Sequence, residues 1–144
     1  MLSAGYKHNV IPQTATAALD CRFLPGHEDA LLDTIRELAG DHVEVEVAHR
    51  DISLDAPFSG SIVEAMKQSL LAEDPTATIL PYSLSGGTDN KSLHRLGIAG
   101  YGFAPLRLPA DLDFAPMFHG IDERVPIESL RFGARVLRDF LGRV

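Results

Sequence analysis

A histidine followed closely by acidic side chains stands out in the segment DFAPMFHGIDERVPIESL, residues 113–130. His119 lies in a proline-containing stretch without helical or strand periodicity, and Asp122 and Glu123 come shortly after it. Imidazole nitrogen and carboxylate oxygen both bind zinc in proteins. A catalytic base or an exposed loop histidine would fit the same spacing, and the chain contains no His-Glu-x-x-His or similar cluster. The spacing alone therefore leaves the role of His119 open.

The segment SLSGGTDN, residues 83–90, places two glycines where a buried strand is expected to meet a helix. Ligands bind at such junctions in α/β sheets, because backbone N–H groups there can approach an anion. Gly87 and the hydroxyl of Thr88 are candidates for that contact. A tight turn in which Thr88 or Asp89 caps the next helix explains the motif equally well.

Two polar residues near the N-terminus are further candidates for ligand binding. Arg22 lies on the polar face of a predicted strand beside Asp20, so it forms either a surface ion pair or a clamp for a substrate carboxylate. Asn9 precedes the segment VIP and either ends a turn or donates a hydrogen bond to a ligand. The single cysteine, Cys21, excludes an internal disulfide and a cysteine-built zinc site.

The elements that position these residues form two patterns, and the first covers residues 1–54. Apolar and polar residues alternate over 14–25 and again over 43–50, which predicts two half-buried strands. Between them, apolar residues at helical spacing predict a helix over 27–39, which Gly40 ends. The segment NVIP precedes the strand over 14–25, and we expect a small antiparallel α+β layer in the order strand-strand-helix-strand.

The second pattern covers residues 55–144 and is of the α/β type. Ser61 with Glu64 predicts a capping box at the start of a helix, and continuous apolar runs predict buried strands over 77–84 and 98–105. Two strands make a poor sheet by themselves, so this part is predicted to be the edge of a larger one. A last helix begins at Pro126, and its predicted core stripe is Ile127, Leu130, Ala134, Leu137 and Leu141.

Composition narrows the class of protein. The chain has 144 residues, of which 45% are hydrophobic, and a net charge of −7. A negative chain is a poor ligand for nucleic acid or an anionic membrane surface, and no apolar run reaches the length of a membrane span. We therefore expect a soluble, cytoplasmic protein that binds neither nucleic acid nor membrane.

Taken together and in order, three segments resemble the C-terminal part of M20-family metallopeptidases and amidohydrolases. They are KHNVIPQTATAALDCRFLPG, SGGTDN and FHGIDERVPIESL. The resemblance covers nearly the whole chain. It implies that residues 1–54 are the later part of a lid, or dimerisation, domain inserted into the family's catalytic domain, and that residues 55–144 close the catalytic domain.

The resemblance also implies roles for single residues. His119 matches a histidine that binds one of two zinc ions, and Asn9 and Arg22 match lid residues that contact the substrate, often across a dimer. Gly87 and Thr88 match the turn that lines the substrate pocket, whereas Asp122 and Glu123 orient the loop. The implied reaction is cleavage of an amide bond in a dipeptide or N-acyl amino acid, whose identity the sequence leaves open.

The family's other metal ligands, its catalytic glutamate and its oxyanion-stabilising histidine have no counterpart in the chain. We therefore expect a truncated product, an expressed fragment or one half of a split enzyme, inactive alone. The alternative is a non-catalytic binding or dimerisation module derived from the family. Either form leaves strand edges and apolar faces uncovered, so we expect a homodimer or an element-swapped oligomer, or assembly with a missing N-terminal half.

Overall fold

The computed structural model describes all residues, Met1–Val144, and divides them into two compact units. Unit 1 consists of Met1–Leu54 together with Leu84–Gly87, and unit 2 of Asp55–Ser83 together with Thr88–Val144. The glycine turn 84–87 thus belongs to unit 1, although the sequence groups it with the second part of the chain. Whether the units are a lid portion and a catalytic-domain portion stays a prediction.

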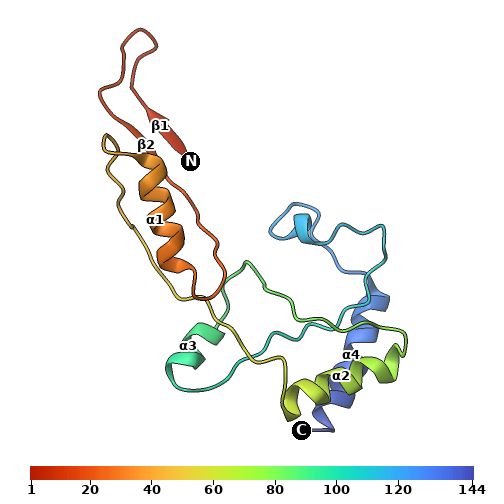
Figure 1. Cartoon of the computed structure of the whole chain (residues 1–144). Coiled ribbons are helices and arrows are strands. Elements are labelled where there is room, and N and C mark those ends of the chain that lie inside the picture. The colour runs from red at the N-terminus through yellow and green to blue at the C-terminus, as the bar shows by residue number, and fades with distance from the viewer. The chain divides into compact units, whose positions relative to one another are not determined.

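A short antiparallel hairpin opens unit 1 (Figure 1). Strand β1, Leu2–Ala4, pairs with β2, Ala15–Ala17, in the register Leu2↔Ala17. The bond from the Ala18 amide to the Met1 carbonyl, 2.8 Å, lengthens this ladder by one step. The predicted strand over 14–25 is therefore a strand only at 15–17. The structure assigns no strand to residues 43–50, whose backbone finds no neighbouring strand with which to pair.

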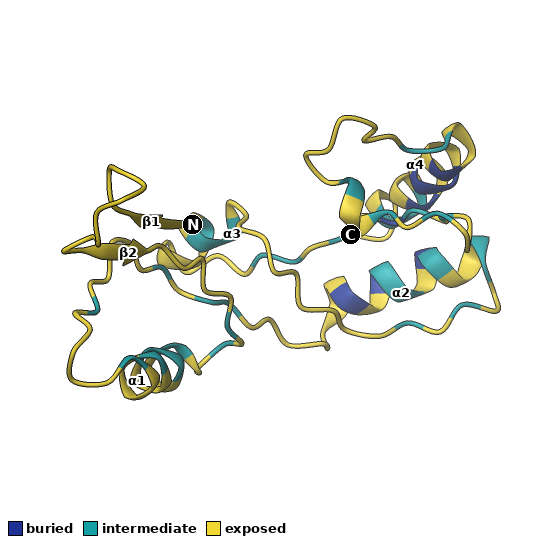
Figure 2. Ribbon diagram, turned by 90° about the horizontal axis from the view of Figure 1, so that it is seen from above, coloured by how far each residue is buried: buried dark blue, intermediate teal, exposed yellow.

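The predicted helix of unit 1 is confirmed as α1, Glu28–Ala39. Two acidic residues in its first turn, Glu28 and Asp29, suit the positive end of the helix dipole. Gly40 ends the helix with φ at 69°, a conformation that favours glycine, and its amide donates to the carbonyl of Arg36. Every residue of unit 1 is exposed or half-buried, as the teal and yellow ribbon of α1 shows (Figure 2).

Unit 2 is organised around two antiparallel helices, α2, Ser61–Glu73, and α4, Ile127–Leu141. Their direction follows from two contacts: Arg143 donates to Gln68 at 2.9 Å, and Arg135 donates to Glu73 at 2.7 Å. Apart from Pro105, the buried apolar side chains of the chain lie on this pair of helices: Val63, Ala65, Phe132 and Val136. Two shorter elements complete the unit, α3, Asn90–Arg95, and the 3-10 turn η1, Ala115–Met117.

The predicted start of α2 is wrong in its details. Gly60, with φ at 100°, occupies the position before the helix, and no side chain caps it. Ser61 is therefore the first helical residue rather than the cap. Glu64 pairs with Lys67 at 2.8 Å, so it does not close a capping box.

The predicted core stripe of α4 is also wrong. Ile127, Leu130 and Leu141 are 67%, 52% and 68% exposed, while the buried face consists of Ser129, Phe132, Gly133 and Val136. Small residues allow the close approach on this side: a Cβ added at Gly133 would lie 2.7 Å from the Pro105 carbonyl oxygen. The Ser129 hydroxyl donates to the Arg107 carbonyl at 2.6 Å. Contact with the backbone of 105–107, rather than side-chain hydrophobicity alone, selects the face of α4.

The two predicted strands of unit 2, residues 77–84 and 98–105, are not strands in the structure. They are extended, and half-buried residues alternate with exposed ones in part of each, as at Ala77 and Ile79 or at Tyr101 and Phe103. The Phe103 ring contacts Phe140 of α4 edge to face, with the centroids 5.4 Å apart. The segment 98–105 thus packs on α4, and neither segment forms a strand ladder within the chain.

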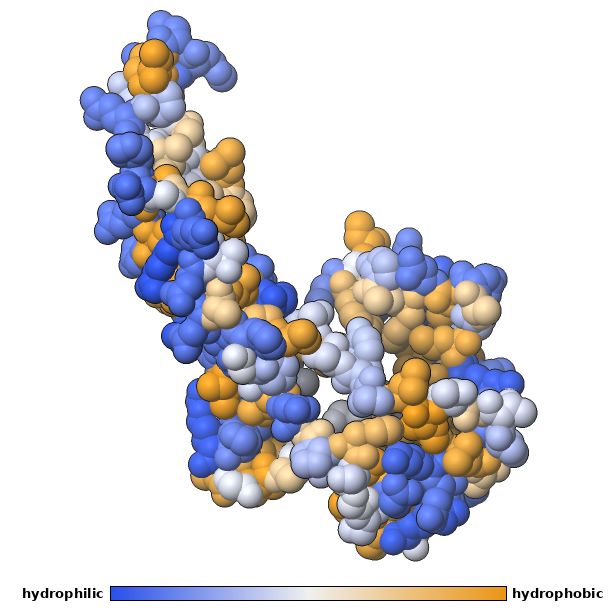
Figure 3. All heavy atoms as spheres, in the orientation of Figure 1, coloured by the Kyte–Doolittle hydropathy of each residue, from blue (hydrophilic) through white to orange (hydrophobic).

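Large apolar side chains remain at the surface of both units (Figure 3). They include Leu80 and Tyr82 of the extended segment 77–84, which are 74% and 84% exposed. None of the helices combines the length and the hydrophobicity needed to cross a membrane.

Candidate functional site

His119 lies at the tip of a tight turn that follows η1. Its φ of 61° is the only positive value at a non-glycine residue in the chain. The amide of His119 donates to the Glu123 carboxylate at 3.0 Å, and the next amide, of Gly120, donates to the carbonyl of Met117 at 2.9 Å. A residue with a Cβ adopts this left-handed region only at a cost, so the surrounding contacts must hold it there.

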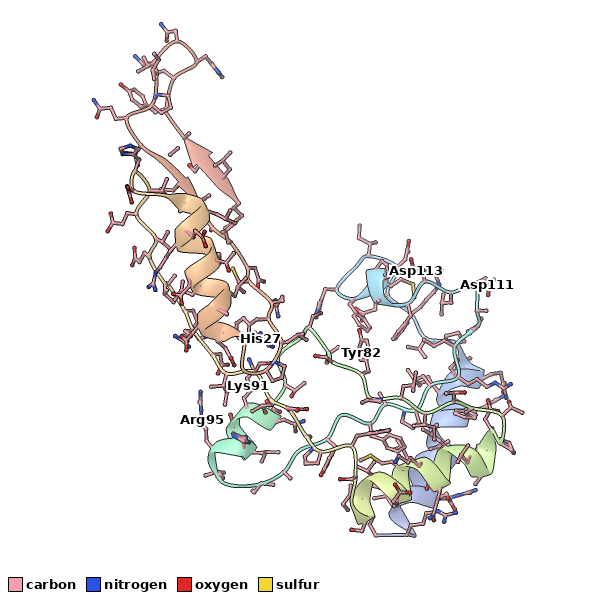
Figure 4. All side chains as sticks on the ribbon, viewed as in Figure 1. His27, Tyr82, Lys91, Arg95, Asp111 and Asp113 are labelled. Carbon is pink, nitrogen blue, oxygen red and sulfur yellow. The ribbon has the colours of Figure 1, made fainter.

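The residues around His119 fix the loop from both sides. Before it, the rings of Phe114 and Phe118 contact edge to face with centroids 5.0 Å apart. After it, Arg124 donates to the carbonyl of Asp122 at 2.9 Å. Asp111 and Asp113, labelled in Figure 4, lie on the segment that leads into η1. The turn is thus built locally, by short-range contacts within residues 113–124.

The side chains of this chain do not make up a metal site by themselves. Nowhere do three or more His, Cys, Asp or Glu side chains gather as ligands. Beside His119, the Glu123 carboxylate already accepts the backbone amide. Most zinc sites in proteins have at least three protein ligands, so the metal role of His119 stays a prediction.

Arg22 and the glycine turn come together in unit 1. One terminal guanidinium nitrogen, Nη1, donates to the carbonyl of Ser85 at 2.6 Å, and the other, Nη2, pairs with Asp20 at 2.7 Å. The hydrogen bond from Arg22 lowers the pKa of the Asp20 carboxyl, and the same bond raises the pKa of Arg22. Arg22 is 56% exposed, so it remains accessible to an anionic group even though both ends of its guanidinium are engaged.

A shallow hollow of about 270 Å³ lies beside Arg22. The sequence gives no reason to connect His27 with Arg22, yet both line this hollow, together with Phe23, Leu31 and Thr34. His27 is labelled in Figure 4 at the start of α1. The connection arises because the chain reverses at Gly26, where φ is 78°.

The other predicted substrate contacts are not brought to one place. Asn9 lies exposed in the loop between β1 and β2, and no hydrogen bond joins its side chain to Arg22. Gly87 belongs to unit 1 and Thr88 to unit 2. The alternative prediction, that Thr88 or Asp89 caps the helix after the glycine turn, is wrong for the side chains. Asp89 occupies the position before α3, but no side chain donates or accepts a capping hydrogen bond there. No observation tests the substrate role of these residues, which stays a prediction.

Comparison with known proteins finds one family model and several relatives that resemble the chain. Residues 1–47 match the model of a peptidase dimerisation domain. The chain is 30% identical to N-fatty-acyl-amino acid synthase/hydrolase PM20D1 of Mus musculus, over 98% of this chain and 29% of that protein. It is 28% identical to probable carboxypeptidase S-like 2 of Dictyostelium discoideum, over 91% of this chain and 26% of that protein.

Aminoacylase-1 of Homo sapiens is also 28% identical, over 86% of this chain and 30% of that protein. The chain thus spans less than a third of the length of these relatives, and no solved structure matches it. The dimerisation-domain match and the similarity along nearly the whole chain agree with the order of the three sequence motifs, and together they support an M20-family peptidase.

Proposed function

We propose that the chain is part of a zinc-dependent hydrolase that cleaves the amide bond of a dipeptide or N-acyl amino acid, and that it is inactive alone. The observation that supports this most directly is the similarity along 86–98% of the chain to proteins named as an aminoacylase and as an N-fatty-acyl-amino acid synthase/hydrolase. The substrate class is carried over from those names and from the family resemblance.

In this proposal His119 is one ligand of a zinc centre whose other ligands come from polypeptide outside residues 1–144. Zinc, when bound, polarises a carbonyl and lowers the pKa of a bound water. The chain's own contribution is positional: the turn over 117–123 presents the imidazole from a fixed backbone. Arg22 binds a substrate carboxylate, for which its planar guanidinium is suited, and Asn9, Gly87 and Thr88 contact other polar groups of the substrate.

Assembly is part of the same proposal. The dimerisation-domain match over residues 1–47 supports a homodimer, and the short β1–β2 hairpin leaves free strand edges at which a second copy can pair. The extended segments 77–84 and 98–105 have apolar side chains and no strand partner within the chain. We infer that an N-terminal half of the catalytic domain supplies the missing strands.

Hydrolysis assays test the function. The purified chain is mixed with zinc or cobalt and with N-acetyl amino acids, N-fatty-acyl amino acids and dipeptides, first alone and then with a separately expressed N-terminal half. We expect no turnover alone and turnover with the second polypeptide. His119→Ala should abolish that turnover, whereas His94→Ala, which changes an exposed histidine of α3, should leave it unchanged.

A non-catalytic dimerisation module is the second candidate. It is favoured by one observation, that the family-model match lies on the dimerisation domain while the chain lacks a cluster of three metal ligands. Restored turnover in the two-polypeptide assay would exclude this candidate. Turnover by the chain alone, lost in His119→Ala, would contradict the proposal that the chain needs other polypeptide.

A further inference from the structure

The turn at His119 poses a conformational question that its sequence position does not answer. His119 is the only non-glycine residue with a left-handed backbone, and both His119 and Ile121 are exposed, so burial at the tip of the turn does not explain this conformation. A flexible loop would relax such a residue to a negative φ. Something local must therefore make the left-handed conformation the stable one.

The geometry points to the Glu123 carboxylate as that element, and we propose that Glu123 is a positioning residue that holds His119 in its left-handed backbone conformation. Its Oε2 accepts the His119 amide at 3.0 Å, a bond to a charged acceptor and hence stronger than one to a neutral group. The adjacent bond, from the Gly120 amide to the Met117 carbonyl, closes the turn but leaves the His119 amide without another acceptor.

Glu123 and its acidic neighbour have different roles in this arrangement. Asp122 takes part through its backbone carbonyl, which accepts a hydrogen bond from Arg124, whereas its carboxylate accepts no hydrogen bond from the His119 amide. The hydrogen bond to the His119 amide requires a side chain long enough to extend back across the turn, and Glu123 has that length. Asp122→Ala is therefore a matched control, because it removes a nearby negative charge without removing the bond to His119.

The experiment uses the 144-residue chain, labelled for NMR, without metal. Two quantities report on residue 119: the hydrogen-exchange rate of its amide, and the strong intraresidue cross-peak between amide and Hα protons that a positive φ produces. We expect Glu123→Ala to raise the exchange rate about tenfold, as for loss of one charge-assisted hydrogen bond, and to remove the strong cross-peak. Glu123→Gln keeps an acceptor oxygen, so its exchange rate at residue 119 and its intraresidue cross-peak should stay close to those of the wild type. Asp122→Ala should change neither.

A double-mutant cycle separates positioning from a general effect on the loop. Glycine adopts positive φ readily, so in the His119→Gly background the cross-peak pattern of positive φ should persist after Glu123→Ala. If Glu123→Ala leaves the backbone of His119 unchanged, or if Asp122→Ala has the same effect, the proposal is wrong.

We call the hydrogen bond from the His119 amide to Glu123 the Glu123 clamp. Its functional importance rests on the proposed metal role of His119, but the clamp and the metal role can fail separately. Loss of the clamp is read from the backbone of the metal-free chain. The metal role is read from zinc binding and turnover in the assembled protein. A chain in which Glu123 controls residue 119, but in which His119→Ala leaves zinc binding and turnover intact, would support the clamp and contradict the metal role.

Discussion

Replacing Gly133 with alanine tests the packing of α4, because two physical effects predict opposite signs. Alanine is favoured over glycine inside a helix by about 1 kcal/mol, so propensity alone predicts stabilisation. In the structure, however, the added Cβ would lie 2.7 Å from the Pro105 carbonyl oxygen, which belongs to backbone and cannot swing aside. The helix or the 105–107 segment must then move apart.

The magnitude follows from these two terms. Forcing a methyl group into a well-packed contact costs about 1–3 kcal/mol, and the helix gains about 1 kcal/mol, so Gly133→Ala should lower the free energy of unfolding by up to about 2 kcal/mol. Ser129 lies one helical turn before Gly133, and its hydroxyl donates to the Arg107 carbonyl at 2.6 Å. The same displacement of the helix lengthens this hydrogen bond. Both effects act within unit 2.

Urea unfolding followed by far-ultraviolet circular dichroism measures this change, with hydrogen exchange of the Val136 amide to locate it in α4. Ala134→Gly is the matched control on the exposed side of the same helix, and propensity alone should make it less stable by about 1 kcal/mol. A Gly133→Ala variant more stable than the wild type would refute the close approach of α4 to Pro105, and with it the buried face assigned to this helix.

Three further predictions concern single contacts and assembly. The hydrogen bond from the Thr76 hydroxyl is the chief cause of a lowered pKa at Asp74. The ionised Asp74 carboxylate therefore stabilises the fold at pH values above the ordinary carboxyl pKa. This stabilisation is lost as the pH falls through the lowered pKa of the folded state. Asp74→Asn should therefore be less stable than the wild type near neutral pH, and urea midpoints of the two should converge in acid; a constant gap would exclude the linkage. Arg22→Ala should speed hydrogen exchange in the 84–87 turn, since the bond to Ser85 disappears, whereas unchanged exchange there would show that the bond does not hold the turn. Light scattering at high concentration should find a dimer or larger oligomer, and a monodisperse monomer would contradict the proposed assembly.

The helices of this chain were predictable from sequence, and their packing was not. Periodicity and end signals locate α1, α2 and α4 to within a residue or two, because Gly40 and Pro126 act locally. The buried face of α4 depends instead on a non-local approach to the 105–107 backbone. That approach needs small side chains, Ser129 and Gly133, which hydrophobic patterning assigns to the surface.

The predicted strands failed for a different reason, which is the lack of a pairing partner. Alternation along 43–50 and the apolar runs over 77–84 and 98–105 predict strands, but a strand also requires a partner for its backbone hydrogen bonds. The chain supplies such a partner only between β1 and β2. The sequence thus indicates which segments are suited to a sheet, whereas the pairing that makes a strand depends on contacts that the pattern of a single segment does not reveal.

At the candidate site, residue types point to His119 and Arg22, and the structure adds their surroundings. The contact of Arg22 with Ser85 joins positions far apart in the chain, and the left-handed backbone occurs at His119, whose amide donates to Glu123, rather than at a glycine. Neither could be read from spacing, because the Arg22 contact is non-local and only a few per cent of non-glycine residues adopt a positive φ, even though histidine is enriched among them.

The zinc content of the assembled protein tests the central claim most directly. The chain and an N-terminal half of the family are combined, freed of loose metal by gel filtration and analysed for zinc beside a His119→Ala variant prepared in the same way. We expect zinc to be bound only by the combination, and the His119→Ala variant to lose about one equivalent. Equal zinc in the variant, or tight stoichiometric zinc in residues 1–144 alone, would contradict that claim.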